Sequence, residues 1–391
     1  GSKEETKMSF YLSIREVWRN RGRFVLFSLV IALITILVLF VAALGNGLAN
    51  ANRQFIDKLD ADLIVLQENV DLNLTSSRIT QDKLEDIKSI AGVAEAGLLA
   101  FSSATLVFDN GLETLDVSII GVTPGELGNP SLLEGNPLNN SSANEIIIDN
   151  KVADNIGLQV GDQVSLRSIQ GEDESFFDLT IAGITDERQF FFASSVIMSL
   201  TTWNEVRPQA SPAPQSGDVL GNMVAVKLAD GVDQSIIEGR LINTIEKIEV
   251  ADKITVIEAQ PGYGPQQATV NAQKGFAYLI GVLVVGGFFQ IQTLQKVPQL
   301  GMLKAIGTDN RTVGAAALMQ IIIVTIIGIL IGGIGVFLLY LGIPDSVPLS
   351  FNVPTVLTAI GSLLLIGPIG GLVSIRIALK VEPLTAIGLS S

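Results

Sequence analysis

The chain has 391 residues, of which 48% are hydrophobic and only 16% are charged. A soluble protein of this length needs more charge to cover its surface. Cysteine and histidine are both absent, which excludes disulfides, thiol catalysis, Cys/His zinc sites and a Ser-His-Asp triad. The net charge of −14 argues against a nucleic-acid partner.

Residues 1–23 are expected to form a cytoplasmic N-terminal segment. Met8 is a reasonable natural start, so residues 1–7 are left out of the fold argument. In 9–23, Phe10, Ile14 and Trp18 share one helical face. This pattern predicts an amphipathic helix that lies along the inner membrane surface.

Four later stretches are long enough to cross a bilayer, which takes roughly 20 apolar residues. We expect transmembrane helices at 24–46, 273–295, 313–341 and 356–375. Their apolar runs carry no charged residue, whereas an ion-coupled transporter needs polar or charged groups inside the membrane. The spans therefore disfavour a secondary transporter.

Basic residues flank these spans on one side only. Lys and Arg outnumber Asp and Glu in 1–23, in the loop 296–312 and in the tail 376–391. By the positive-inside rule these segments, and therefore both termini, are cytoplasmic. The stretch 47–272 and the short loop 342–355 are then external, and 47–272 carries 13 Lys and Arg against 33 Asp and Glu.

The external stretch 47–272 combines strand and helix patterns. Strands are expected at 62–67, 104–108, 115–121, 145–149, 163–167, 179–184, 224–228 and 254–257, and helices at 80–90, 151–156 and 233–248. Proline and glycine predict a mobile loop at 208–222 and a linker at 260–265. The predicted fold is an α-helical membrane protein with four transmembrane helices, one plus three, and a large α+β extracytoplasmic domain inserted between helices 1 and 2.

No motif for catalysis is present: the chain has no phosphate loop, no HExxH and no GxSxG followed by histidine. We therefore expect no enzyme activity, no metal and no cofactor in this chain. The glycine pairs Gly286-Gly287, Gly332-Gly333 and Gly370-Gly371 lie in membrane spans. Small residues there predict close helix packing rather than a ligand site.

The segment 293–307, TLQKVPQLGMLKAIG, mixes lysines with apolar residues between spans two and three. The pattern alone allows either an interfacial helix or a docking helix. The segment resembles the motif of the FtsX-like permease family, in which this loop is the coupling helix that docks on a cytosolic ABC ATPase. The implied coupling residues are Pro298, Gln299, Leu300, Gly301, Met302, Leu303, Lys304, Ala305, Ile306 and Gly307.

Two further stretches carry the same resemblance. The tail 378–388, ALKVEPLTAIG, is similar to the closing motif of the family, and 133–164 is similar to the core domain of MacB-like permeases. The resemblance implies a type VII ABC transmembrane subunit in the bacterial plasma membrane. It also implies a permease homodimer in the lipid bilayer with two copies of a separate ATPase, which binds ATP and Mg²⁺.

Within the family, 13–50 and 293–307 look most like haem-exporting permeases. This resemblance implies export of a hydrophobic or amphiphilic compound, with haem as the candidate. Because the chain has no histidine, the iron would have to be ligated by a tyrosine, a methionine or a carboxylate. The candidate substrate-binding residues are Tyr263, Tyr278, Phe40, Leu44 and Phe276.

The same residues also suit interface anchoring and helix packing. Two other functions remain open at this stage. The permease could control an external hydrolase or adaptor, or it could release lipoproteins or peptides.

Overall fold

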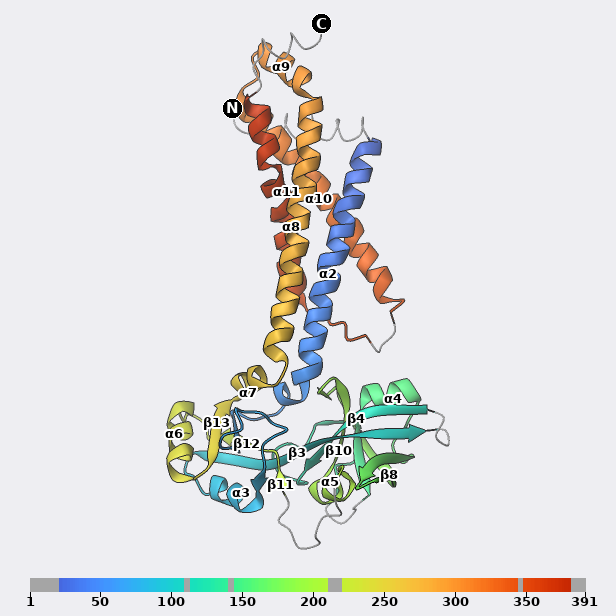
Figure 1. Cartoon of the computed structure of the whole chain (residues 1–391), viewed down its shortest axis with the longest axis vertical. Coiled ribbons are helices and arrows are strands. Elements are labelled where there is room, and N and C mark those ends of the chain that lie inside the picture. Colours follow the sequence, from blue (N-terminus) through green and yellow to red (C-terminus); the bar gives the residue numbers. More distant parts are fainter. Residues whose placement is uncertain (1–20, 109–112, 140–143, 210–219, 344–346, 381–391) are drawn as a thin grey trace. The chain divides into compact units, whose positions relative to one another are not determined.

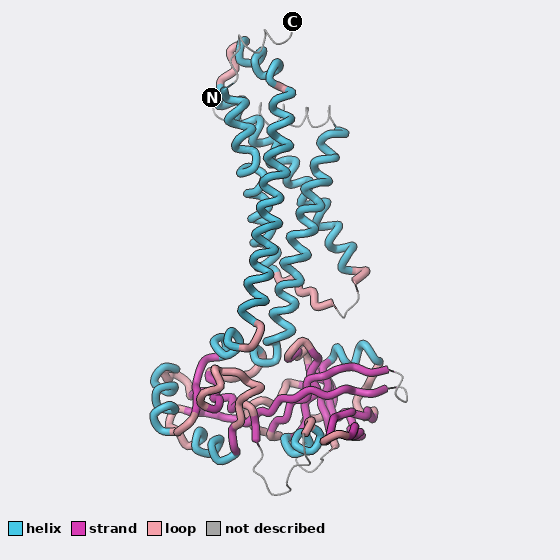
Figure 2. The backbone as a smooth tube through the Cα atoms, viewed as in Figure 1, coloured by secondary structure: helices cyan, strands magenta, loops and turns pink. Residues whose placement is uncertain are grey.

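The computed structural model describes residues 21–108, 113–139, 144–209, 220–343 and 347–380. The described chain forms two compact units (Figures 1 and 2). The membrane unit comprises residues up to Gly47 and those from Gln267 onward, and the inserted domain is Leu48–Gln266. Residues 9–20 of the predicted helix at 9–23, most of the loop 208–222 and most of the tail motif lie outside the described residues, and residues 21–23 belong to the first helix of the structure.

Four helices of the structure are long and apolar enough to cross a membrane. They are α2 (Arg21–Asp57), α8 (Tyr263–Gln295), α10 (Asn310–Tyr340) and α11 (Val353–Lys380). Helix α2 continues beyond its apolar run, and α8 begins before its own. Both helices therefore have one end in the membrane unit and the other in the domain.

Helices α2 and α10 pack closely because glycines line the contact. A Cβ atom added to Gly332 of α10 would lie 2.5 Å from the Cβ of Thr35 and 2.7 Å from the carbonyl oxygen of Ala32. Gly328 lies in the same way against Ile31. Only residues without a side chain allow two backbones to approach so closely.

Helices α8 and α11 also meet through glycine. A Cβ on Gly370 would lie 2.7 Å from the carbonyl oxygen of Val282 and 2.9 Å from the amide nitrogen of Gly286. The packing role predicted for the glycine pairs is therefore confirmed for Gly286, Gly332 and the pair Gly370-Gly371. Gly287 and Gly333 have no described atom within 4 Å of an added Cβ.

The domain is built on one 11-stranded mixed sheet (Figure 2). Its main order is β13-β1-β12-β3-β4-β10-β6-β8-β5, with β7 joining β3 and β8 and β9 joining β10, and β11 and β2 form a separate pair. The strands are β1 (Leu63–Gln67), β2 (Ile79–Thr80), β3 (Val93–Phe108), β4 (Glu113–Val122), β5 (Leu132–Gly135), β6 (Glu145–Asp149), β7 (Gln163–Gln170), β8 (Asp173–Thr185), β9 (Gln189–Phe190), β10 (Ala193–Ser199), β11 (Leu220–Gly221), β12 (Met223–Leu228) and β13 (Ile248–Asp252).

The central strands are continuously apolar because both faces of the sheet are covered. Alternate side chains of a strand enter opposite cores: Leu63 and Val65 join one, and Ile64 and Leu66 the other. The first core is closed by helices α3 (Gln81–Lys88), α5 (Leu200–Val206) and α6 (Gln234–Thr244). Helix α4 (Asn150–Ile156), which follows β6, adds Val152 and Ala153 to this first core. The second core is closed by the end of α2 and by α7 (Lys253–Ala259).

Three sequence-based expectations for the domain are wrong. Residues 254–257 form helix α7 rather than a strand, because the Asp252 carboxylate accepts a hydrogen bond from the Thr255 amide and caps a helix there. The helix expected at 233–248 ends at Thr244, and its last expected residue, Ile248, begins β13. The stretch 260–265 is not a free linker, since Gln260 is buried and bonds to the backbone of Leu72.

Candidate functional site

The segment predicted to be the coupling helix folds as a short helix, α9 (Val297–Ala305), between α8 and α10 (Figure 1). Pro298 lies in its first turn, where the fixed φ of proline favours a helix start. Gly307 has φ +99° just after the helix, and its amide bonds to the carbonyl oxygen of Lys304. Because glycine adopts this conformation readily, α9 ends there.

One face of α9 is exposed and apolar, and a hydrogen bond from the helix ties it to α11. The side chain of Met302 on α9 is 60% exposed, and that of Ile306, the residue at the C-cap of α9, is 80% exposed. The Lys304 ammonium donates a hydrogen bond of 2.8 Å to the carbonyl oxygen of Leu379 near the end of α11. The backbones of Leu300 and Leu303 lie in α9, but their side chains are outside the described set. The helix therefore combines a free apolar surface with a fixed position.

The five candidate substrate residues do not form one described site. Tyr263 and Tyr278 both lie on α8, and at 1.5 Å per residue they are about 22 Å apart along it. Tyr263 is half-buried against the second core of the domain, whereas Tyr278 packs among the helices of the membrane unit. They cannot ligate the same iron within one chain.

The other three candidates belong to the membrane unit. Phe40 and Leu44 are half-buried and one helical turn apart on α2, and Phe276 of α8 is 66% exposed. The helices carrying them are neighbours, because Gly45 of α2 lies against Val270 of α8. The exposed ring of Phe276 is available to lipid, substrate or another chain.

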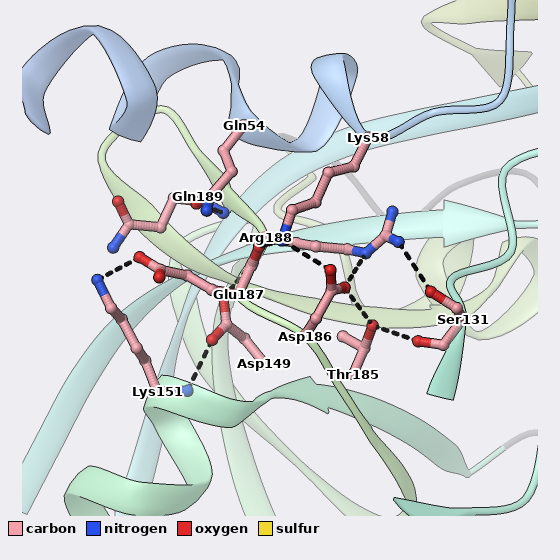
Figure 3. A network of polar contacts seen from close by, with 10 residues as sticks. All are labelled: Gln54, Lys58, Ser131, Asp149, Lys151, Thr185, Asp186, Glu187, Arg188 and Gln189. Carbon is pink, nitrogen blue, oxygen red and sulfur yellow. Dashed lines mark hydrogen bonds and ion pairs between the residues drawn. The ribbon is translucent and has the colours of Figure 1, made fainter. Parts of the chain in front are cut away.

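A polar cluster that no local sequence pattern indicates holds the domain end of α2 (Figure 3). The Lys58 ammonium donates to the Asp186 carboxylate at 2.7 Å and to the carbonyl oxygen of Glu187. Arg188 donates from Nε to the same carboxylate at 2.8 Å. The Gln189 amide donates to Oε1 of Gln54 at 3.1 Å. The last turn of α2, through Gln54, and the residue that follows the helix, Lys58, are thus bonded to residues 186–189.

Two carboxyl groups in this cluster have pKa values shifted in opposite directions. Burial raises the pKa of Asp149 above its usual range, although its carboxylate accepts hydrogen bonds from the amides of Lys151 and Arg188. Partial burial acts to raise the pKa of Asp186 as well, but the hydrogen bonds and positive charges of Lys58 and Arg188 outweigh it and lower the value. Lys151 also pairs with Glu187.

The features described so far define a class: a multi-pass membrane protein with a mixed α+β domain inserted after the first span and a short helix between the second and third. The family model of the MacB-like periplasmic core domain matches residues 24–244, and that of the FtsX-like permease C-terminal region matches residues 275–383. The chain therefore belongs to the FtsX-like and MacB-like family of ABC transporter permeases.

Full-length relatives agree with this assignment. The chain is 28% identical over 377 residues to a permease protein from Staphylococcus haemolyticus named for a hemin transport system, HrtB, covering 96% of this chain and 99% of the relative. HrtB of Staphylococcus epidermidis is 25% identical, with 96% and 99% covered. The uncharacterized ABC transporter permease Mb2592 of Mycobacterium bovis is 22% identical, with 97% and 99% covered.

Solved structures of isolated domains are also similar. The periplasmic region of MacB from Actinobacillus actinomycetemcomitans has 13% identity and a TM-score of 0.37, covering 50% of this chain and 90% of that one. The extracellular domain of YknZ from Gram-positive bacteria has 17% identity and a TM-score of 0.35, covering 49% and 99%.

Proposed function

We propose that this chain is the permease subunit of an ATP-driven exporter that works as a homodimer with two copies of a separate ATPase. The cargo is a hydrophobic or amphiphilic compound moved outward from the membrane, and haem is the candidate. The ATPase partner follows from membership of the ABC permease family. The choice of haem rests on relatives named for hemin transport that align over 96% of the chain.

The observation that carries the proposal is the exposed apolar face of α9. Met302 and Ile306 are too exposed to stabilise the membrane unit of a single chain. A short helix with apolar anchors suits a groove on a partner protein. The basic residues around this loop favour the cytoplasmic side, where an ATPase has access to ATP.

The contacts of α9 supply a path for movement. Lys304 links α9 to the carbonyl oxygen of Leu379 on α11, and α11 meets α8 through Gly370 and Gly286. Helix α8 then continues as one helix to Tyr263 in the domain. A displacement of α9 by the ATPase would therefore act on α8 and α10 through the chain and on α11 through the hydrogen bond of Lys304.

The test is co-purification of the ATPase with the Ile306→Asp variant. A charge in an apolar groove carries a desolvation penalty of several kcal/mol, so we expect the ATPase to be lost from the complex. Because Ile306 is 80% exposed, the permease itself should keep its thermal stability. Ile254→Asp, on an exposed isoleucine of α7, is the matched control and should retain the ATPase. Undiminished co-purification of Ile306→Asp would remove α9 from the interface.

A further inference from the structure

A cleft opens in the inserted domain beside β5, the strand at one edge of the sheet. Its walls come from β5, from α4 and the loop that follows it, and from β8, and its volume is about 680 Å³. Its lining residues belong to the stretch 133–164, with Ile184 of β8 as the exception. Protein sites for small ligands have volumes of about 300–1,000 Å³. The size of the cleft therefore suits a small ligand or a few side chains of a peptide.

Hydrogen bonds hold the walls of the cleft in place. The hydroxyl of Thr185, at the end of β8, donates to the carbonyl oxygen of Ser131, just before β5, at 2.8 Å (Figure 3). On the other side, the amide of Gly161, in the loop after α4, donates to the carbonyl oxygen of Ile181 on β8 at 2.8 Å. Both walls are thus tied to the same strand. The cleft is preformed, so a ligand does not have to order its walls on binding.

A β-bulge places an apolar side chain in the cleft. Leu132 pairs with Thr185 and Glu134 pairs with Ile184, so Leu133 is an extra residue without a partner in the ladder. Its side chain lines the cleft and is 59% exposed, and the exposed side chain of Val160 lines it as well. Bulges at sheet edges interrupt strand pairing and turn a side chain in a new direction. The edge therefore offers side chains for recognition rather than a regular strand for another strand to join.

The polar part of the lining is rich in acceptors and lacks a positive charge. The carboxylates of Glu134 and Asp154 are exposed, and neither forms an ion pair in the part of the chain that the structure describes. No lysine or arginine lines the cleft. The Oδ1 atom of Asn150 is buried and has no hydrogen-bond partner among the described residues. Unpaired acceptors of this kind favour a ligand that brings positively charged donors.

We propose that this cleft binds an amphiphilic cation, with an ammonium or guanidinium group against Glu134 and Asp154 and an apolar body against Leu133 and Val160. A metal ion is a poor occupant, because the described residues contain no group of three or more acidic side chains that could hold one. The propionate carboxylates of haem would be repelled by the same acids, so the site is separate from that of the proposed cargo. The cationic group belongs either to a free organic amine or to a basic side chain of a peptide, and experiment separates these two sources.

The absence of cysteine from the chain allows a site-specific test. An environment-sensitive fluorophore is attached to Gln159→Cys, at the exposed rim of the cleft, in the full chain. The chain is held in nanodiscs of phosphatidylcholine, whose headgroups have no net charge. The probes are hexylamine, the neutral analogue hexanol, and an acetylated tripeptide amide of leucine, lysine and leucine. We expect a saturable fluorescence change with the amine or the peptide, at concentrations several-fold lower than any change with hexanol.

Two double variants separate the cleft from general attraction to an acidic domain. Glu134→Gln with Asp154→Asn removes both carboxylates of the cleft and should weaken binding of the cations several-fold. Glu172→Gln with Asp173→Asn removes two exposed charges at the turn between β7 and β8 and should leave binding unchanged. All four side chains are exposed, so both variants should keep the thermal unfolding midpoint of the wild type.

The relative affinities of the two cationic probes identify the source of the cation. Tighter binding of the peptide assigns the cleft to a basic peptide segment, and equal or tighter binding of hexylamine assigns it to a free amine. The proposal is overturned if neither cation gives a saturable change, if hexanol binds as well as hexylamine, or if both double variants bind equally. None of these readouts involves the ATPase or haem, so their failure is distinct from a failure of the proposed function.

Discussion

Asp149 and Asp186 belong to one polar cluster, yet they respond to acid in opposite ways. The pKa of Asp186 is lowered in the folded chain, so its ionised form adds stability that is present above about pH 4 and is lost as the pH falls through the folded value. The pKa of Asp149 is raised, so its contribution is present at low pH and is lost as the pH rises through the folded value.

Replacing Asp186 with Asn should therefore lower stability in a pH-dependent manner. We expect a lower thermal unfolding midpoint than wild type at pH 7, because Lys58 and Arg188 lose their charged partner. The two proteins should begin to converge as the pH falls below about 4 and should converge fully only below the lowered pKa of the folded state, where the wild-type carboxyl is protonated. The buried Trp203 of the domain reports unfolding by fluorescence. A difference that stays constant from pH 7 to pH 3 would contradict the assignment, and Asp149→Asn is the control with the opposite trend.

Local residue patterns were readable in the sequence, whereas this cluster was not. The helix predicted at 151–156 forms as α4, with Asp149 at its N-cap and Gly157 at φ +76° after its end. Those signals lie within nine residues of one another. The residues that hold α2, from Gln54 to Gln189, are separated by more than a hundred positions, and nothing in their local pattern indicates that they meet.

At the level of elements, the contact between α8 and α11 provides a sharp test. Gly370→Ala would place a methyl group 2.7 Å from the carbonyl oxygen of Val282, so the two helices must separate. We expect this change to destabilise the membrane unit by about 1–3 kcal/mol, as overpacking does in other well-packed sites. The measurement is the thermal unfolding midpoint of the chain in nanodiscs.

Gly333→Ala is the matched control for this substitution. It also adds one methyl group to a glycine of a membrane helix, but no described atom lies within 4 Å of the new carbon. Alanine is the better helix former, so stability should be equal or slightly higher. If both variants lost the same stability, the cause would be the loss of glycine itself rather than the close contact between α8 and α11.

The membrane helices were predicted better than the domain elements, for a physical reason. An apolar run of 20 residues has few alternatives to a spanning helix, and all four form. Short β-branched runs such as 254–257 are ambiguous, and a capping aspartate made that run a helix. Strand β3 is also longer than expected, since Val93–Phe108 pairs with three neighbours that only the complete sheet provides.

At the level of the whole assembly, haem can be tested directly as the cargo. Haemin added to the reconstituted permease and ATPase should raise ATP hydrolysis and give a saturable change in the Soret band. If Tyr263 ligates the iron through its phenolate, Tyr263→Phe should weaken the spectral change while Tyr278→Phe, about 22 Å away along α8, should not.

Two results would separate the remaining possibilities. A saturable spectrum that Tyr263→Phe leaves unchanged would move the ligand elsewhere and keep haem as the cargo. The absence of both the spectral change and ATPase stimulation would exclude haem. The contact path from α9 to α8 would then serve equally well for controlling an external hydrolase or adaptor.

The position of β1 between β12 and β13 has a consequence for the synthesis of the protein. Leu63 pairs with Val226 and with Asp252, so the first strand waits for partners that follow more than 160 residues later. At about 5–20 residues per second, the ribosome needs roughly 10–40 s to deliver them. During that time α2 is already available to the membrane, while the strand beside it has an unpaired edge open to proteases and to other nascent chains.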